Sequence, residues 1–153
     1  MLFIYLLALA IWIGAIVFFS FFTAPAVFQN LPRSEAGTVV GAIFPRYYAL
    51  GYVAGAISLA AAVYFAMSRE ARVWWSGAAI TLAIALGISV YAGAAILPRA
   101  HALRAVVEQD NPDPERKAEF DQLHRLSVIL NGSVLLLDLA ALAISSGALN
   151  YRG

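Results

Sequence analysis

The sequence predicts an all-α integral membrane protein. We expect a four-helix transmembrane bundle with a short interfacial helix after the first span and a protruding hairpin between the third and fourth spans. Hydrophobic residues make up 62% of the 153 residues and charged residues only 12%, against about 25% charged residues in a soluble domain. The charges are confined to short connections, so long uncharged stretches remain. Segments that alternate apolar and polar residues are absent, which argues against a β-barrel.

The uncharged stretches are long enough to cross a hydrocarbon core, which takes about 20 helical residues. The first lacks the basic residues and short apolar core of a signal peptide, so we read it as a retained span. In the last stretch, Leu126–Tyr151, Asp138 is the only charged residue. A single transmembrane domain over residues 1–153 is predicted, with spans at about 1–24, 47–68, 73–98 and 125–149.

The connections have structure of their own. Pro32 breaks the chain after the first span, and apolar residues at helical spacing then predict an interfacial helix over about 34–45. We expect that helix to end or kink near Pro45. The third connection keeps helical periodicity on both sides of a turn, with Asp113 placed to cap and Pro114 at the first helical position, so it predicts an antiparallel hairpin.

Lys and Arg are unevenly divided between the two sides. The first and third connections lie on one side and carry seven of them, and the other side carries three. The positive-inside rule places both termini outside and the hairpin in the cytoplasm, as expected for a bacterial inner membrane protein. The expected partner is the lipid bilayer, and no nucleic acid. The pairs Gly37/Gly41 and Gly51/Gly55 predict close packing, either within the chain or in a homo-oligomer.

Polar residues fall on one face of the fourth span. One interpretation is a seam of interhelical hydrogen bonds, each worth about 0.6–2 kcal/mol. Asp138 lies near mid-span, where a carboxylate costs at least about 2.5–3.5 kcal/mol. It is either a neutral structural acid or a proton or ion site. In the first case it would bond to a tyrosine or serine of another span, such as Tyr5, Tyr52, Ser58, Ser89 or Tyr91. The residues at this helical spacing are His124, Ser127, Asn131, Asp138 and Ser145.

The two histidines flank the hairpin at similar height. With Asp121 nearby, His101 and His124 could bind a divalent metal, or His124 could ligate haem. The alternative is that both imidazoles make hydrogen bonds at the membrane interface. The chain has no cysteine and no nucleophile elbow, P-loop or dinucleotide fingerprint, so the sequence points away from an enzyme.

Several short motifs occur in order along most of the chain. They are Trp12-Ile13-Gly14 with Phe18 and Phe22, Leu31-Pro32-Arg33 with Ala36-Gly37, Ile43-Phe44-Pro45 with Tyr47 and Tyr48, Leu97-Pro98-Arg99, and Phe120 with Leu123-His124, Ser127 and Asn131. In these motifs the chain resembles the transmembrane-protein-205-like family, small four-span proteins of unknown function. The resemblance implies a fold and a candidate surface, not a substrate. Asp138 and His101 lie outside the motif positions.

The motif residues and the polar residues of the fourth span map to the same side of the membrane, the side where the first and third connections meet. We predict a binding site there, with His124 at its polar centre, the tyrosines as its wall and two arginines at its rim. The predicted binding residues are Arg46, Tyr47, Tyr48, Arg99, His124, Ser127, Asn131 and Asp138, and the candidate metal ligands are His124 and His101.

Three functions remain open. The first is a non-enzymatic membrane protein that binds or moves a small solute, lipid or ion. The second is a haem- or metal-binding membrane protein of redox or tolerance type, which uses His124 and His101. The third is an accessory or scaffold subunit of a membrane complex.

Overall fold

The computed structural model describes residues 1–67, 71–107 and 113–150. All regular elements within these ranges are helical. Four helical segments are long and apolar enough to cross a membrane, which confirms the predicted four-helix transmembrane bundle. They are Leu2–Asn30, Arg33–Met67, Arg72–Arg104 and Pro114–Asn150.

The first span is longer than predicted. It runs through α1 (Leu2–Val17), the π-helical segment η1 (Phe18–Thr23) and α2 (Ala24–Asn30) without a break. Pro25 stands at the start of α2, directly after the π-helical turn. A proline inside a helix removes one backbone hydrogen bond, and the π-helical turn before Pro25 already departs from the regular α-helical bonding pattern there. The helix therefore continues past the expected end near residue 24.

The second span and the predicted interfacial helix are one element, α3 (Arg33–Met67). Of the two outcomes expected near Pro45, an end or a kink, the end is wrong, since the helix continues through this residue; the kink stays a prediction. Proline removes one backbone hydrogen bond, but buried residues lie on both sides of it along α3, including Gly41 and Tyr48. Packing of the flanking turns is thus sufficient to hold the helix together.

The third and fourth spans form the predicted hairpin. Asp113 caps the last helix, because its Oδ1 accepts a hydrogen bond of 3.1 Å from the backbone N–H of Glu115, and Pro114 is the first helical residue. The hairpin tip, residues 108–112, lies outside the described residues. The elements of these two spans are α4 (Arg72–Tyr91), the π-helical segment η2 (Ala92–Ile96), α5 (Leu97–Val107) and α6 (Pro114–Asn150).

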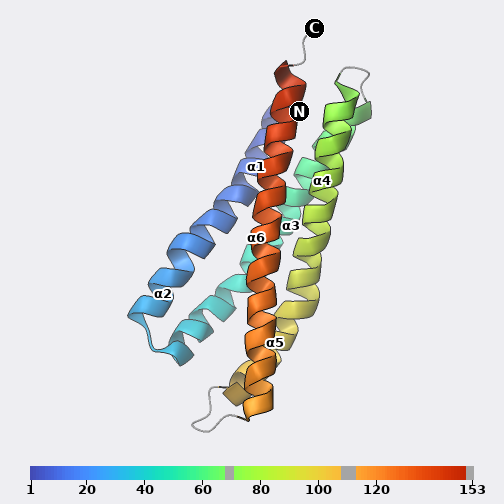
Figure 1. Cartoon of the computed structure of the whole chain (residues 1–153). Helices are drawn as coiled ribbons and strands as arrows, with labels where there is room; N and C mark the ends of the chain where they lie inside the picture. Colours follow the sequence, from blue (N-terminus) through green and yellow to red (C-terminus); the bar gives the residue numbers. More distant parts are fainter. Residues whose placement is uncertain (68–70, 108–112, 151–153) are drawn as a thin grey trace.

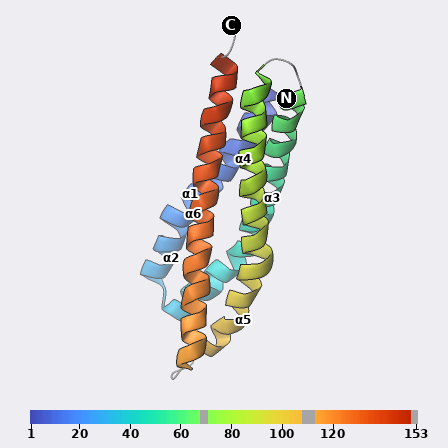
Figure 2. The same cartoon turned by 45° about the vertical axis from the view of Figure 1, so that its right-hand side comes forward.

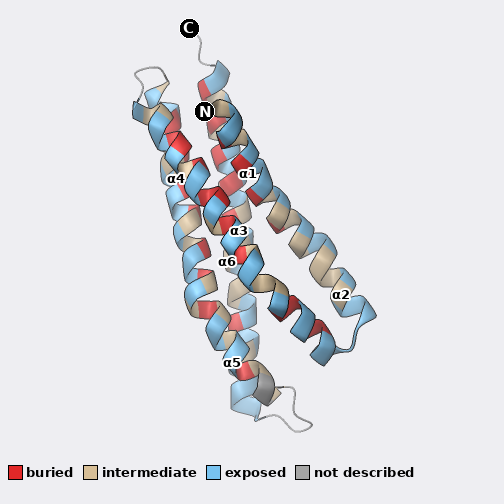
Figure 3. Ribbon diagram, turned by 180° about the vertical axis from the view of Figure 1, so that it is seen from behind, coloured by how far each residue is buried: buried red, intermediate tan, exposed pale blue. Residues whose placement is uncertain are grey.

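The helices are not all parallel to one another. Figures 1 and 2 show both termini at one end of the bundle and the α5–α6 hairpin at the other. α4 and α6 lie side by side, whereas α2 diverges from α6 towards the hairpin end (Figures 1 and 3). Buried residues gather on the inner faces of the helices in Figure 3. The bundle is therefore tightly packed near the termini and more open near the hairpin.

Both glycine pairs of α3 accommodate side chains of the same chain. The Trp12 indole lies over Gly51 and Gly55: a Cβ at Gly55 would come within 2.6 Å of Trp12 Cζ3, and one at Gly51 within 3.1 Å of Trp12 Nε1. Trp12 is consequently only 2% exposed. Gly37 and Gly41 accommodate side chains of α5 in the same way. Packing within the chain thus accounts for both pairs, and a homo-oligomer stays a prediction.

We predict that Gly55→Ala destabilises the bundle by about 1–3 kcal/mol, because the new methyl group overlaps the Trp12 ring. The matched control is Gly87→Ala, since a Cβ there meets nothing within 4 Å, and it should be neutral or slightly stabilising. The free energy of unfolding in detergent micelles distinguishes the two. Equal stability of both variants would contradict the packing described for Trp12.

Candidate functional site

Three helices meet at the side chain of Asn131. The Tyr47 hydroxyl of α3 donates a hydrogen bond to Asn131 Oδ1 of α6. Asn131 Nδ2 donates in turn to Ser20 Oγ of η1, at 2.9 Å. All three side chains are half-buried. This Ser20–Asn131–Tyr47 relay joins the first, second and fourth spans, and Asn131 and Tyr47 were among the predicted binding residues.

A cluster of aromatic rings surrounds the relay, and we call it the aromatic cluster. Phe19 lies with its ring centroid 4.9 Å from Tyr47 and 5.3 Å from Phe44. Tyr47 and Tyr48 make an edge contact at 5.3 Å. Tyr48 continues towards Tyr52, at 6.1 Å. The tyrosines of α3 thus lie side by side next to the relay, and Tyr48 is itself buried; their role as the wall of a binding site stays a prediction.

The two π-helical segments flank the aromatic cluster. η1 supplies Ser20 and Phe19. η2 supplies Gly93, where a Cβ would come within 2.8 Å of Tyr48 Cδ1. π-Helical turns are rare and occur frequently at functional sites. Their position on both sides of the α3 tyrosines is a second indication, besides the relay, that this region is the candidate site.

The charged rim and the predicted polar centre are more exposed than the relay. Arg46 and Arg99 are exposed, and Arg46 Nη1 donates to the carbonyl of Ala42, at 3.0 Å. His124 is also exposed, and its ring stacks on Phe120 of the same helix at 6.5 Å. Ser127 is half-buried. The polar centre of the site is therefore Asn131, not His124 as predicted.

The two histidines have different neighbours. His101 lies against α3, where a Cβ at Gly41 would come within 2.7 Å of His101 Nε2. Arg104 also lies against α3, where a Cβ at Gly37 would come within 2.6 Å of Arg104 Cζ. Among the described residues, no three His, Asp or Glu side chains come together to hold a metal ion. The predicted pairing of His101 with His124 around a metal or haem gains no support from this geometry.

Asp138 lies in the interior of the bundle. It is 0% exposed, and within the described part of the chain neither carboxyl oxygen has a hydrogen-bond partner. The Tyr5 hydroxyl, which was a candidate partner, lies 3.5 Å from the carbonyl oxygen of Ala141. Ser145, on the same face of α6, donates to the carbonyl of Leu142 at 2.9 Å. The predicted hydrogen bond from a tyrosine or serine to Asp138 is thus not formed.

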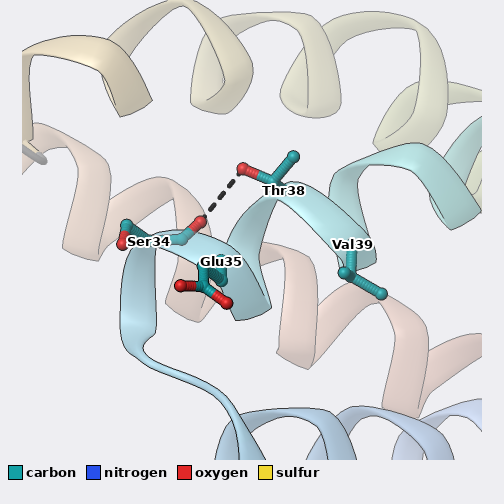
Figure 4. A pocket seen from close by; sticks show the side chains of 4 residues that line it. All are labelled: Ser34, Glu35, Thr38 and Val39. Carbon is teal, nitrogen blue, oxygen red and sulfur yellow. Dashed lines mark hydrogen bonds between the residues drawn. The ribbon is translucent and has the colours of Figure 1, made fainter.

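Two open depressions on the described surface lie away from this site. One, of about 400 Å³, is lined by Ser34, Glu35, Thr38 and Val39 at the start of α3, where the Thr38 hydroxyl donates to the Ser34 carbonyl at 3.0 Å (Figure 4). The other, of about 450 Å³, is lined by Ala118, Asp121, Gln122 and Arg125 of α6. Neither is lined by a residue of the relay or the aromatic cluster. The candidate site is therefore separate from both depressions.

Two site residues were not predicted from the sequence. They are Ser20 and Phe19, which lie in a run of phenylalanines. The only sequence signal for a site there is Ser20 itself, a polar residue in an apolar run. A serine in that position satisfies its hydroxyl on its own helix as readily as on another. Only the packing of α6 against η1 shows that Ser20 bonds to Asn131.

Comparisons with known proteins support the fold and leave the function open. A family model described as a domain of unknown function, DUF4149, matches residues 7–109. An uncharacterized protein of Aquifex aeolicus (strain VF5) is 30% identical over 136 residues, which is 89% of each chain. No solved structure matches at a significant level. These findings fit a four-span domain of unknown function, and the resemblance to the transmembrane-protein-205-like family stays a prediction.

We predict that Tyr47 and Asn131 are energetically coupled. In a double-mutant cycle with Tyr47→Phe and Asn131→Ala, the coupling free energy should be about 0.6–1.7 kcal/mol, the range of interhelical hydrogen bonds in membranes. Ser133→Ala replaces Asn131→Ala in the control cycle, because Ser133 bonds only to its own helix, at Ile129. The control coupling should be close to zero. Equal couplings in both cycles would contradict the relay.

Proposed function

We propose that this chain, which belongs to the DUF4149 family of unknown function, is a small membrane protein that binds an amphipathic molecule from the bilayer. The binding surface is the relay and the aromatic cluster on the membrane-facing side of the bundle. The ligand has a hydroxyl or carbonyl group and an apolar ring or chain. This proposal narrows the predicted solute, lipid or ion to one chemical class.

The observation that carries the proposal is the relay itself. Asn131 uses one amide N–H for Ser20 and one lone pair of its oxygen for Tyr47. The side-chain amide has a second N–H, and the Ser20 hydroxyl has a hydrogen of its own to donate. These groups are half-buried within the predicted spans, and hydrogen-bonding capacity that faces lipid is costly when it is unused. A ligand oxygen would satisfy it.

The surroundings of the relay suit the apolar part of such a ligand. Phe19, Phe44 and Tyr47 present ring faces and edges next to Asn131. Phe18 and Phe22 of the same π-helical segment are stacked on each other and more than half exposed, at 65% and 62%. α2 diverges from α6 on this side (Figure 1). A flat ring or an acyl chain could therefore approach the relay from the lipid.

Charged groups on the same side suit a polar end. In the predicted topology Arg46, Arg99 and His124 lie at the membrane boundary nearest the relay, and all three are exposed. Long basic side chains can reach the headgroup region from such positions. A ligand with an anionic or strongly polar end would thus extend from the rim to the relay. Four spans leave little room for a conduit inside one bundle, which favours binding at the lipid-facing surface over passage through the middle.

The proposed location is the cytoplasmic membrane of a bacterium, with the hairpin in the cytoplasm. The Lys and Arg distribution supports this orientation. The Aquifex aeolicus relative, which aligns with 89% of the chain, is bacterial and so consistent with this location. In this orientation the binding surface lies in the cytoplasmic half of the bilayer.

We predict preferential photolabelling of the relay. The protein in lipid nanodiscs is exposed to a long-chain fatty alcohol that carries a diazirine next to its hydroxyl group, and labelled peptides are mapped by mass spectrometry. Label should concentrate on residues 18–22, 44–48 and 127–131. Asn131→Leu should reduce it about five-fold, the equivalent of about 1 kcal/mol, whereas Ser133→Ala should have no effect. Uniform labelling of the lipid-facing residues, such as Val128 and Leu136, would refute the proposed site.

We predict opposite accessibility for the two ends of the bundle. The chain has no cysteine, so Gln122→Cys on the hairpin and Val73→Cys at the start of α4 each introduce a single thiol at an exposed position. In intact spheroplasts, a membrane-impermeant maleimide should label Val73→Cys and spare Gln122→Cys. The reverse pattern would overturn the proposed orientation without affecting the binding proposal.

A further inference from the structure

We propose that Asp138 is a proton-binding site in the middle of the bundle, and that release of its proton parts α6 from α1 and α4, against which it packs. This site is distinct from the relay, and the proposal does not depend on a ligand binding there. It assigns a role to the one acidic residue that lies within the spans predicted from the sequence.

The carboxyl group is isolated from water and from hydrogen-bond partners. Asp138 is 0% exposed, and both carboxyl oxygens lack a partner among the described residues. One turn to either side, Val134 and Ala141 belong to the main apolar core. Native structures seldom leave a buried polar group unpaired, so such a group calls for an explanation.

The structure offers no charge that would hold Asp138 ionised. The first three uncharged stretches contribute no Lys, Arg or His to the interior. The titratable groups that interact electrostatically with Asp138 are Tyr5 of α1 and Tyr47 of α3. α4 faces the core with apolar side chains, including Leu82 and Ala85. With two phenols and no cation around it, the carboxyl is stable in this packing only as the neutral acid.

A second unpaired polar group lies in the same core. Ser58 of α3 is 0% exposed, and its hydroxyl has no partner within the described ranges. Its neighbours on α3, Ala54, Ala61 and Ala62, belong to the same apolar core as Val134 and Ala141. Water that enters this core would therefore meet two groups that it can hydrogen-bond. Such a site is polar enough to hold water once the helices part.

A proton fits this place better than a metal ion does. Calcium and magnesium take six or more oxygen ligands, usually with several carboxylates or waters. Asp138 is the only carboxylate in the spans predicted from the sequence, and the described residues include no cluster of three acidic or histidine side chains. A proton needs no cage and no cavity.

Release of the proton has a structural consequence. The ionised carboxylate needs water, so α6 must separate from the helices that enclose Asp138, and the water that enters accepts the proton. Asn131 lies seven residues before Asp138 on the same face of α6, which is about two helical turns. Movement of α6 would thus stretch the bonds from Asn131 to Tyr47 and Ser20. Protonated Asp138 would thus keep the hydrogen bonds of the relay intact, and a rise in pH would break them.

The first test observes the proton directly. Protein labelled with ¹³C at the aspartate carboxyls is placed in lipid nanodiscs, and its infrared or solid-state NMR spectrum is recorded from acidic to alkaline pH. We expect one protonated carboxyl signal to persist at neutral pH. It should be absent from Asp138→Asn and present in the control Asp121→Asn, which removes an exposed aspartate of the hairpin. An ionised Asp138 at neutral pH would overturn the proposal.

The second test observes the opening. Amide hydrogen exchange of residues 127–141 is compared between the wild-type protein and Asp138→Asn at matched pH, so that the intrinsic pH dependence of exchange cancels in the ratio. Asn mimics the neutral acid and cannot ionise. The wild type should exchange at least ten-fold faster than the variant at alkaline pH and equally at acidic pH. If the ratio of wild-type to variant exchange rates stayed the same from acidic to alkaline pH, Asp138 would be only a structural acid and the proposed opening would be refuted. Ser58→Ala, which keeps the carboxyl, should retain the pH dependence if Asp138 is its source.

Discussion

The constraint on which the rest of the structure depends is that lipid offers no hydrogen bonds. Each polar side chain inside a span must find a partner within the protein or remain unsatisfied at a cost. Thr81 and Ser133 bond to the backbone one turn earlier in their own helices. Asn131 is too rich in polar atoms for that solution, and it links α6 to two other helices instead. Asn131 therefore forms the centre of an interhelical side-chain network that joins α6 to α3 and η1.

Small residues decide where the helices can approach one another. Trp12 fits over Gly51 and Gly55, and Trp74 lies against Gly147, where a Cβ would come within 2.9 Å of the ring. These contacts hold the terminal half of the bundle together. Towards the hairpin, α2 and α6 diverge (Figure 1), and Gly37, Gly41 and Gly93 accommodate the side chains of Arg104, His101 and Tyr48 instead. Glycine contacts with bulky side chains therefore occur along the whole length of the bundle.

Much of the fold could be predicted from the sequence, because charge placement alone divides the chain into spans. The hairpin caps and the polar face of α6 were also predictable, since Asp113, Pro114 and the spacing from Ser127 to Ser145 are local signals. The continuity of α3 through Pro45 was not, because it depends on packing of the turns on both sides. The hydrogen-bond partners within the site could not be predicted from the sequence either. Ser20 has no sequence signal that points to Asn131, and His124, which the motif favoured, turns out to be exposed. Helical spacing indicates which residues share a face, but it does not tell which of them another helix covers.

The account depends most on the contact between Tyr47 and Asn131, and solid-state NMR of the ¹³C-labelled protein in lipid bilayers tests it most directly. A through-space correlation between Tyr47 Cζ and Asn131 Cγ is expected, together with the one between Phe19 and Phe44 that reports correct folding. If the phenylalanine correlation appeared without the tyrosine–asparagine one, α6 would sit differently against α3. The relay would then not exist in the membrane, and the proposed binding surface would fall with it.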